Sequence, residues 1–204
     1  YGEIKGRVNP ETEKDITIKK VIIDKNISYN SFIVKNARLY TDRIHDTAII
    51  LKNKIVDKAS FQLRDNVNVD CEKNIVFSKG TPRIKKKLKG KVLSLLTGGG
   101  GNSNYWHWLF DVLPRTQIVN NFLKSENINY YLFPDLREKF QIETLNLLGI
   151  PKEKRISSQN YRHVLAEEII VTHHPYNILN DPDKDSLNIP YWIISFLRKK
   201  FLKE

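Results

Sequence analysis

Apolar and polar side chains alternate with a period of two through much of the first 90 residues, which is typical of strands that bury one face. The alternation is clearest over residues 15–23 and 31–40, and shorter runs follow at 47–51, 55–56, 59–64 and 74–78. Polar turn signals separate these runs at intervals of about 8 to 12 residues. The pattern predicts a small antiparallel β-rich region over residues 1–90.

A different pattern begins at about residue 90. Continuous apolar runs at 92–96 and 129–133 are typical of strands covered on both faces. Helical periodicity follows each of them, over 103–124 and 136–148, with Asp135 as the expected N-cap of the second helix. Shorter strands are expected at 161–165 and 168–171, and a polar break at 181–185 precedes the final helix.

Strands that alternate with helices form βαβ units around a mostly parallel sheet. The sequence therefore predicts an α/β fold, in which a Rossmann-like domain over residues 91–187 follows the β-rich region. The amphipathic segment 188–204 is predicted to be a linking helix.

Composition limits the classes of partner. The 204 residues include one cysteine, so no internal disulfide framework exists, and no apolar run reaches the roughly 20 residues of a membrane-spanning helix. The formal net charge of +11 admits anionic partners, such as nucleic acid, an acidic membrane surface or phosphate-bearing substrates, and does not choose among them. The basic run at 83–91, RIKKKLKGK, fits a solvated loop or strand edge, with a phosphate or membrane-surface patch as the alternative. It contains no aromatic side chain for base stacking, so we expect no nucleic-acid partner.

Glycine, aromatic and ionisable residues are most concentrated over residues 95–115, LLTGGGGNSNYWHWLFDVLPR. Four glycines at 98–101 allow the backbone to approach a ligand closely, and the start of the following helix offers free N–H groups to phosphate. The spacing is not G-x-G-x-x-G, and no Lys-Ser/Thr pair follows. A dinucleotide fingerprint or a P-loop is therefore disfavoured, and we interpret the glycines as a turn that opens a cleft.

One face of the predicted helix carries candidate chemistry. At roughly 100° per residue, Asn104, His107, Asp111 and Arg115 fall close together. A carboxylate one turn from an imidazole can orient the ring and raise its basicity. Arg115 could hold Asp111 or bind an anion. The alternative is a structural ladder of ion pairs along the same face.

The aromatic residues in this stretch also admit two interpretations. Tyr105 and Trp108 offer a platform for a sugar ring, or Trp108 belongs to the core. Pro114 removes the hydrogen-bond partner of the Phe110 carbonyl and predicts a kink, at a cost of about 3 kcal/mol. A proline at this position favours a shaped site over a plain packing helix.

Two adjacent histidines, His173 and His174, follow the predicted strand at 168–171 at the same sheet edge. Adjacent residues point apart, so the pair is a poor chelate for one metal ion, and no metal site is predicted. We expect the pair to contact an acceptor or line the cleft, with an ordinary loop as the alternative.

Residues 100–115, GGNSNYWHWLFDVLPR, resemble the N-Y-x-H-W-L-x-D-x-L-P-R signature of glycosyltransferase family 61. The β-rich lead-in, the βαβ half and the terminal helix extend the resemblance over most of the chain. It implies the acceptor-side, N-terminal Rossmann-like half of a GT-B enzyme, with a donor-binding half that should begin just after Phe201. The family transfers a sugar from a nucleotide-sugar with inversion and usually needs no metal for chemistry.

The resemblance implies that either His107 or Asp111 is the catalytic base and the other its partner. The predicted substrate contacts in and beside the motif are Gly100, Gly101, Asn102, Asn104, Tyr105, Trp108 and Arg115. The expected partners are a nucleotide-sugar donor, which is a substrate and not a cofactor, and a glycan acceptor.

The Lys-, Ile- and Asn-rich composition suggests a bacterial, cytoplasmic enzyme of surface or capsular polysaccharide assembly, associated peripherally with the inner face of the membrane. The competing hypothesis is a non-catalytic module that binds carbohydrate or an anionic polymer.

Overall fold

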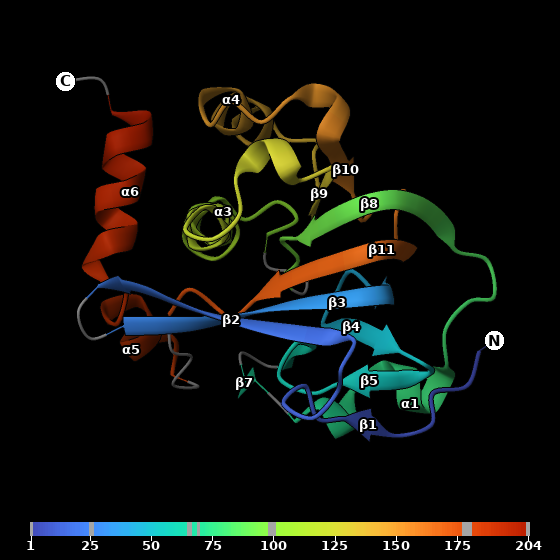
Figure 1. The fold of residues 1–204 in the computed structure, drawn as a ribbon. Helices are drawn as coiled ribbons and strands as arrows, with labels where there is room; N and C mark the ends of the chain where they lie inside the picture. Colours follow the sequence, from blue (N-terminus) through green and yellow to red (C-terminus); the bar gives the residue numbers. More distant parts are fainter. Residues whose placement is uncertain are drawn as a thin grey trace.

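The computed structural model describes residues 2–24, 27–64, 67–68, 70–97, 101–176 and 181–202. The expected α/β class is confirmed: within these residues, a mixed sheet of eleven strands is combined with short helices (Figure 1). The strands are β1 (Arg7–Val8), β2 (Ile16–Asp24), β3 (Ile27–Thr41), β4 (Asp46–Leu51), β5 (Lys54–Val56), β6 (Phe61–Arg64), β7 (Val67–Asn68), β8 (Lys86–Ser94), β9 (Tyr130–Phe133), β10 (Arg155–Ser157) and β11 (His163–Thr172). The α-helices are α1 (Ile75–Lys79), α2 (Tyr105–His107), α3 (Pro114–Asn120), α4 (Lys139–Leu147), α5 (Pro182–Leu187) and α6 (Tyr191–Phe201).

The order of strands along the sheet is β1-β5-β4-β3-β11-β8-β9-β10, with β2 paired to β3 and β6 paired to β4 and β7. Strands β11, β8, β9 and β10 run parallel to one another. The chain places β9 and then β10 on one side of β8, and afterwards places β11 on the other side. Ligands of open α/β sheets bind where the strand order reverses in this way, beyond the carboxyl ends of the strands. Here that position lies between the segments that follow β8 and β11.

The predicted β-rich region and the predicted α/β region share this one sheet, because β3 pairs antiparallel with β11. Three neighbouring strands are irregular at the same level: Asn36 in β3 and Gly90 in β8 have positive φ, and the β11 register with β8 shifts between Ala166 and Glu168. Such irregularities bend strands, and β8 is visibly curved in Figure 1. The bent sheet buries a cluster with members from both sides of the irregular line, including Leu39, Ile49, Val92, Leu132, Val164 and Ile169.

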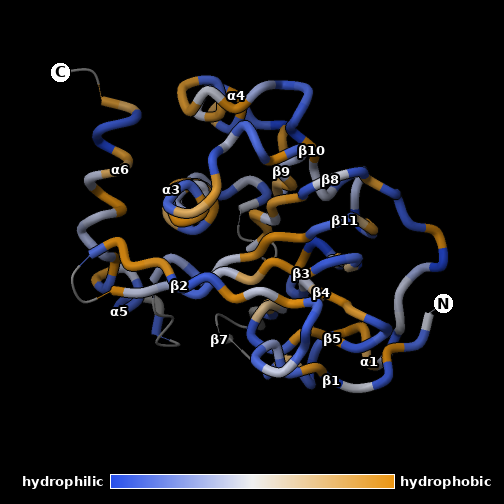
Figure 2. Tube along the Cα trace, in the orientation of Figure 1, coloured by the Kyte–Doolittle hydropathy of each residue, from blue (hydrophilic) through white to orange (hydrophobic). Residues whose placement is uncertain are grey.

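A second cluster lies between the parallel strands and the helices. It includes Leu93 and Phe133 from or beside the sheet, Trp108 and Ile118 from the central helical segment, and Ile193 from α6. Figure 2 shows apolar residues along the central strands and both polar and apolar residues on α3 and α6, as expected for helices with one buried face. A third cluster packs α1 against β4 and β5.

Several predicted elements differ from the observed ones. The segment 74–78, expected to be a strand, is helix α1, because the Asn74 side chain caps its start and Gly80, with a φ of 63°, ends it. Helix α5 occupies the polar break expected at 181–185. The two short strands expected near 161–171 are the single strand β11.

The expected N-cap of the second helix is also wrong. Helix α4 begins after Glu138, whose side chain forms a capping box with Gln141. The Asp135 carboxylate is fully buried and pairs with Arg43 and Arg137. The basic run at 83–91 lies largely in the first part of β8, which pairs with β11, and Lys86 stacks over Tyr161.

No helix within the described ranges is long and apolar enough to cross a membrane.

Candidate functional site

The central helical segment changes its geometry inside the candidate motif. Helix α2 begins after Asn104, whose Oδ1 accepts a hydrogen bond from the His107 amide at 3.3 Å. A π-helical turn, Trp108–Val112, follows, and the Leu113 amide donates to the carbonyl of Trp108 at 3.1 Å. Pro114 then occupies the first turn of α3, where its missing N–H costs least. The interruption predicted at Pro114 therefore takes the form of a π-helical turn, a feature frequent at functional sites.

Asp111 is the centre of a buried polar cluster. Its Oδ2 accepts a hydrogen bond from Nδ1 of His107 at 2.7 Å, and its Oδ1 accepts one from the phenol of Tyr176, also at 2.7 Å. Nε2 of His174 lies 3.7 Å from the same Oδ2. Asp111 is buried, whereas the His107 side chain is 32% exposed. The cluster thus joins the helical motif to the histidine segment after β11.

The charges of this cluster follow from its contacts. Burial alone would raise the pKa of Asp111, but His174 and His107 together outweigh it and hold that pKa well below its ordinary value. Asp111 is therefore a carboxylate, and Nδ1 of His107 must donate to it. The hydrogen bond to Asp111 raises the pKa of His107 against the effect of burial. This arrangement leaves Nε2 of neutral His107 as a proton acceptor.

Arg115 does not extend the series of ion pairs. Its Nε donates to the backbone carbonyl of Asp111 and its Nη1 to the carbonyl of Leu96, each at 3.0 Å. The guanidinium lies 5.9 Å from the ring centre of Phe61. The ladder of ion pairs that the sequence offered as an alternative is therefore limited to the pair His107 and Asp111.

His173 and His174 lie at the edge predicted for them and point to different neighbours. Nδ1 of His174 donates to the carbonyl of Tyr176 at 2.9 Å, and its ring stacks on Phe61 at a centroid distance of 5.8 Å. The backbone of His173 bonds to Asn30, and its ring packs on Phe32. Burial, Lys58 and Arg115 lower the pKa of His173, so its ring is neutral at pH 7.

A cavity of about 980 Å³ opens beside this cluster. Its wall combines residues that follow β8 and β11 with residues from β4, β6 and the segment between β5 and β6, among them Thr47, Lys58, Phe61, Leu96, Arg115, His173, His174 and Tyr176. The free thiol of Cys71 also lines it, and burial raises the pKa of that thiol to about 11, which leaves it protonated at neutral pH.

The predicted glycine turn is only partly described. Gly100, with residues 98 and 99, lies outside the described residues. Gly101 is buried, and a Cβ there would come within 2.7 Å of Val112 and 3.0 Å of Pro134. The Asn102 side chain donates to the carbonyl of Arg43 at 2.8 Å. Gly101 and Asn102 thus pack against neighbouring segments, and the ligand contact expected for them stays a prediction.

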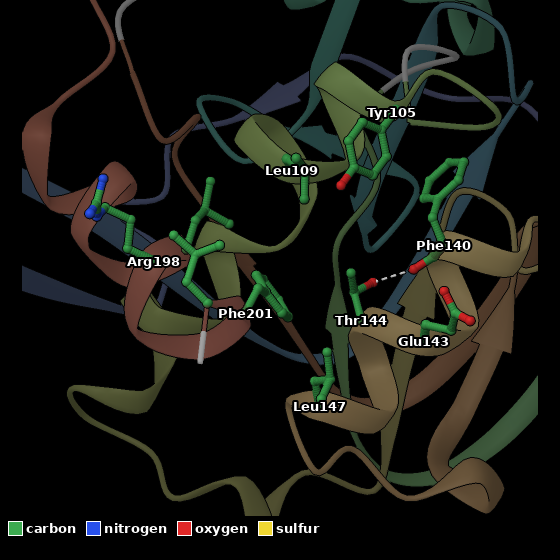
Figure 3. A pocket seen from close by; sticks show the side chains of 10 residues that line it. Tyr105, Leu109, Phe140, Glu143, Thr144, Leu147, Arg198 and Phe201 are labelled. Carbon is green, nitrogen blue, oxygen red and sulfur yellow. Dashed lines mark hydrogen bonds between the residues drawn. The ribbon is translucent and has the colours of Figure 1, made fainter. Parts of the chain in front are cut away.

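Tyr105 and Trp108 point away from a common platform. Tyr105 lines an apolar cavity of about 370 Å³ between α4 and α6, where its ring meets Phe140 edge-on at 5.0 Å (Figure 3). The Trp108 ring is fully buried, and its Nε1 donates to Thr144 at 2.9 Å. Of the two interpretations of Trp108, the structure selects the core, so its ring is not positioned for the substrate contact expected of it.

Sequence reasoning missed Tyr176, Thr47 and Phe61. The sequence could have indicated Tyr176, because it is the last residue of the segment HHPY, which follows the strand predicted at 168–171. Thr47 and Phe61 carry no such signal, because they come from β4 and β6 and meet the later segments only in the folded cavity.

Within the described residues, no group of three or more His, Cys, Asp or Glu side chains could hold a metal ion. Comparison of the chain with protein-family models, curated proteins and solved structures finds no match.

Proposed function

We propose that this chain is the acceptor-side half of an inverting glycosyltransferase of the GT-B type, related to family 61. The observation that carries the proposal is the hydrogen bond between His107 and Asp111, which lies within the motif that resembles the family signature. The pair stands beside a cavity at the reversal of strand order, the position where open α/β sheets bind ligands.

His107 is the base in this proposal, and Asp111 is its partner. Nδ1 of His107 donates to the buried carboxylate, so Nε2 accepts the proton of the acceptor hydroxyl. The hydroxyl oxygen attacks the anomeric carbon of the donor from the side opposite the diphosphate. The new C–O bond forms as the bond to the leaving phosphate oxygen breaks, and the electron pair departs with the diphosphate. Asp111 stabilises the imidazolium that results.

The order of elements supports the GT-B assignment. Support comes from the four parallel strands β8 to β11, in which helical segments connect β8 to β9 and β9 to β10 as in a Rossmann-like half. In this proposal, a donor-binding half of the GT-B type supplies most of the contacts to the nucleotide-sugar. A surface glycan fits as the acceptor, in a bacterial enzyme of capsular or other surface polysaccharide assembly at the inner face of the membrane.

A non-catalytic module for carbohydrate or an anionic polymer is the second candidate. It is favoured by the net charge of +11 and by exposed cationic side chains such as Lys87 and Lys89 on β8. If it holds, the chain binds an anionic polysaccharide in a salt-dependent manner, and replacing residues 85–87 by alanine weakens that binding.

The deciding experiment measures nucleotide release by the full-length protein from a panel of nucleotide-sugars with glycan acceptors. We expect His107→Gln to lower kcat by about 100-fold or more. His45→Gln, in an exposed turn, is the matched control and should keep the parental rate. A His107→Gln protein with parental activity and parental melting temperature would refute the catalytic assignment.

A further inference from the structure

Two buried polar atoms in the wall of the large cavity have no hydrogen-bond partner among the residues that the structure describes. One is Nη2 of Arg115, whose side chain is 2% exposed, and the other is Oγ1 of Thr47. Arg115 comes from α3 and Thr47 from β4, and both residues line the cavity. Unsatisfied buried polar groups are costly, so two of them in one cavity wall indicate a polar ligand at this position.

The guanidinium of Arg115 is charged and has one nitrogen left to offer. Nε and Nη1 already donate to the carbonyls of Asp111 and Leu96, which fix the orientation of the group. Burial lowers the pKa of Arg115 to about 10, so it remains protonated at neutral pH. An arginine fixed on one side and free on the other is suited to bind an oxyanion.

The charges around the cavity indicate a single negative charge on that ligand. Lys58, the other basic residue of the wall, pairs with Glu11 at 3.0 Å. Asp57 and Asp70 line the same cavity, and of these two Asp70 lies 3.6 Å from Arg7. A diphosphate would bring several negative charges towards these carboxylates, whereas one carboxylate is matched by the one guanidinium.

The cavity also reaches two residues that contact the proposed catalytic pair. Tyr176 and His174 line it, and both lie against the carboxylate of Asp111. A ligand of sugar size can therefore place one group at Arg115 and another beside His174 and Tyr176, because about 980 Å³ exceeds the volume of a single sugar ring.

We propose that this cavity binds an acidic sugar acceptor, whose carboxylate is held by Nη2 of Arg115 and the hydroxyl of Thr47. The inference rests on the proposed function, because it names the acceptor class of that site. Its test measures binding alone, so that it can fail while the transferase assignment survives.

The experiment titrates the 204-residue chain with D-glucuronate, D-glucose, acetate and pyrophosphate at a fixed salt concentration, with ligand-detected NMR as the readout. We expect glucuronate to bind at least about tenfold more tightly than glucose or acetate, since hydrogen bonds to charged groups are worth this much. Arg115→Gln and Thr47→Val should each reduce that preference. Arg198→Gln, in the wall of the apolar cavity, should leave it unchanged.

Melting curves establish that each variant is folded. If Arg115→Gln does not fold, Thr47→Val, which keeps nearly the same shape, decides the test. Equal binding of glucuronate and glucose overturns the inference. A preference for pyrophosphate that Arg115→Gln removes also overturns it, because the site would then bind the diphosphate of the donor. Transfer by the full-length protein to neutral acceptors only would leave the proposed function standing and the inference refuted. Glucuronate binding without transfer from any donor would leave the carboxylate site standing and would refute the proposed function.

Discussion

Tyr176 donates its phenolic hydrogen to Oδ1 of Asp111 at a distance of 2.7 Å, across 65 positions of sequence. Both residues are buried, and desolvation together with the adjacent carboxylate raises the pKa of Tyr176, so the phenol stays protonated. This bond connects the segment after β11 with the π-helical turn after β8. It also occupies the oxygen of Asp111 that His107 does not use.

The bond predicts a clear loss of stability on removal of one hydroxyl. We expect Tyr176→Phe to lower the free energy of unfolding by about 1.5 to 3 kcal/mol, because the buried carboxylate loses a charge-assisted hydrogen bond. Tyr191→Phe is the control, since Tyr191 is 78% exposed. Urea unfolding of the three proteins measures the difference. Equal midpoints for Tyr176→Phe and the parent would contradict the role assigned to this bond.

The pairing of His107 predicts a pH dependence of definite sign. Its pKa in the folded state lies above the ordinary value of 6.5, chiefly through the hydrogen bond to Asp111. The stabilisation is therefore fully present below about pH 6.5 and is lost as the pH rises through the raised pKa. We expect the stability difference between the parent and His107→Gln to be larger at about pH 5.5 than at about pH 8.5.

Two further measurements address the same histidine. NMR titration of the imidazole should give a pKa above 6.5, and Asp111→Asn should lower it. In the transferase assay, the acid limb of the rate profile should lie above pH 6.5, because His107 accepts a proton only when it is neutral. A pKa of His107 below 6.5 in the folded parent would refute the charge assignment.

Much of the sheet was predictable from local pattern. The strands β2, β4, β5 and β9 follow the predicted segments closely, because alternation and apolar runs act over a few residues. The pairing of β3 with β11 was not predictable in the same way, since it joins positions more than 120 residues apart. The segment 74–78 was misassigned because two capping residues outweighed its apolar pattern.

The candidate site was predictable where it depends on helical spacing. His107 and Asp111 meet because they are four residues apart, and His174 arrives because β11 ends beside β8. An ideal helix did not predict the position of Arg115, because the π-helical turn changes the relation between residues before and after it. The burial of Trp108 depends on Thr144 of α4, and sequence spacing does not reveal that contact.

The bend in β8 predicts an unusual sensitivity at one glycine. Gly90 has a φ of +84°, and a Cβ there would lie 2.1 Å from Oδ1 of Asn129, which accepts the Lys91 amide. Gly90→Ala should therefore cost about 1 to 2 kcal/mol for the backbone, with a further cost for displacing Asn129. Gly6→Ala isolates the backbone effect, because Gly6 has a φ of +96° and open space around it.

Thermal and urea unfolding of the two alanine variants give the comparison. The larger loss is expected for Gly90→Ala, and the double change Gly90→Ala with Asn129→Ala should recover part of the clash while it loses the bond to Lys91. If the two single variants were equally stable, the close approach of Asn129 would not contribute to the bend.

The fully buried carboxylate of Asp135 predicts different effects for its two arginine partners. Arg43 lies 3.5 Å from Oδ2 of Asp135, and its Nε donates to Ser158 at 3.2 Å, so it links the β3–β4 turn to the segments after β9 and β10. Arg137 lies 2.8 Å from the same oxygen but is 63% exposed. Arg43→Ala should lower the free energy of unfolding by about 2 to 3 kcal/mol, because the loss affects a buried charge and a second hydrogen bond. Arg137→Ala should cost much less, since solvent screens that pair.

Urea unfolding of both variants measures the two losses of stability. A greater loss for Arg137→Ala would show that distance to Asp135, and not burial, governs the strength of these pairs.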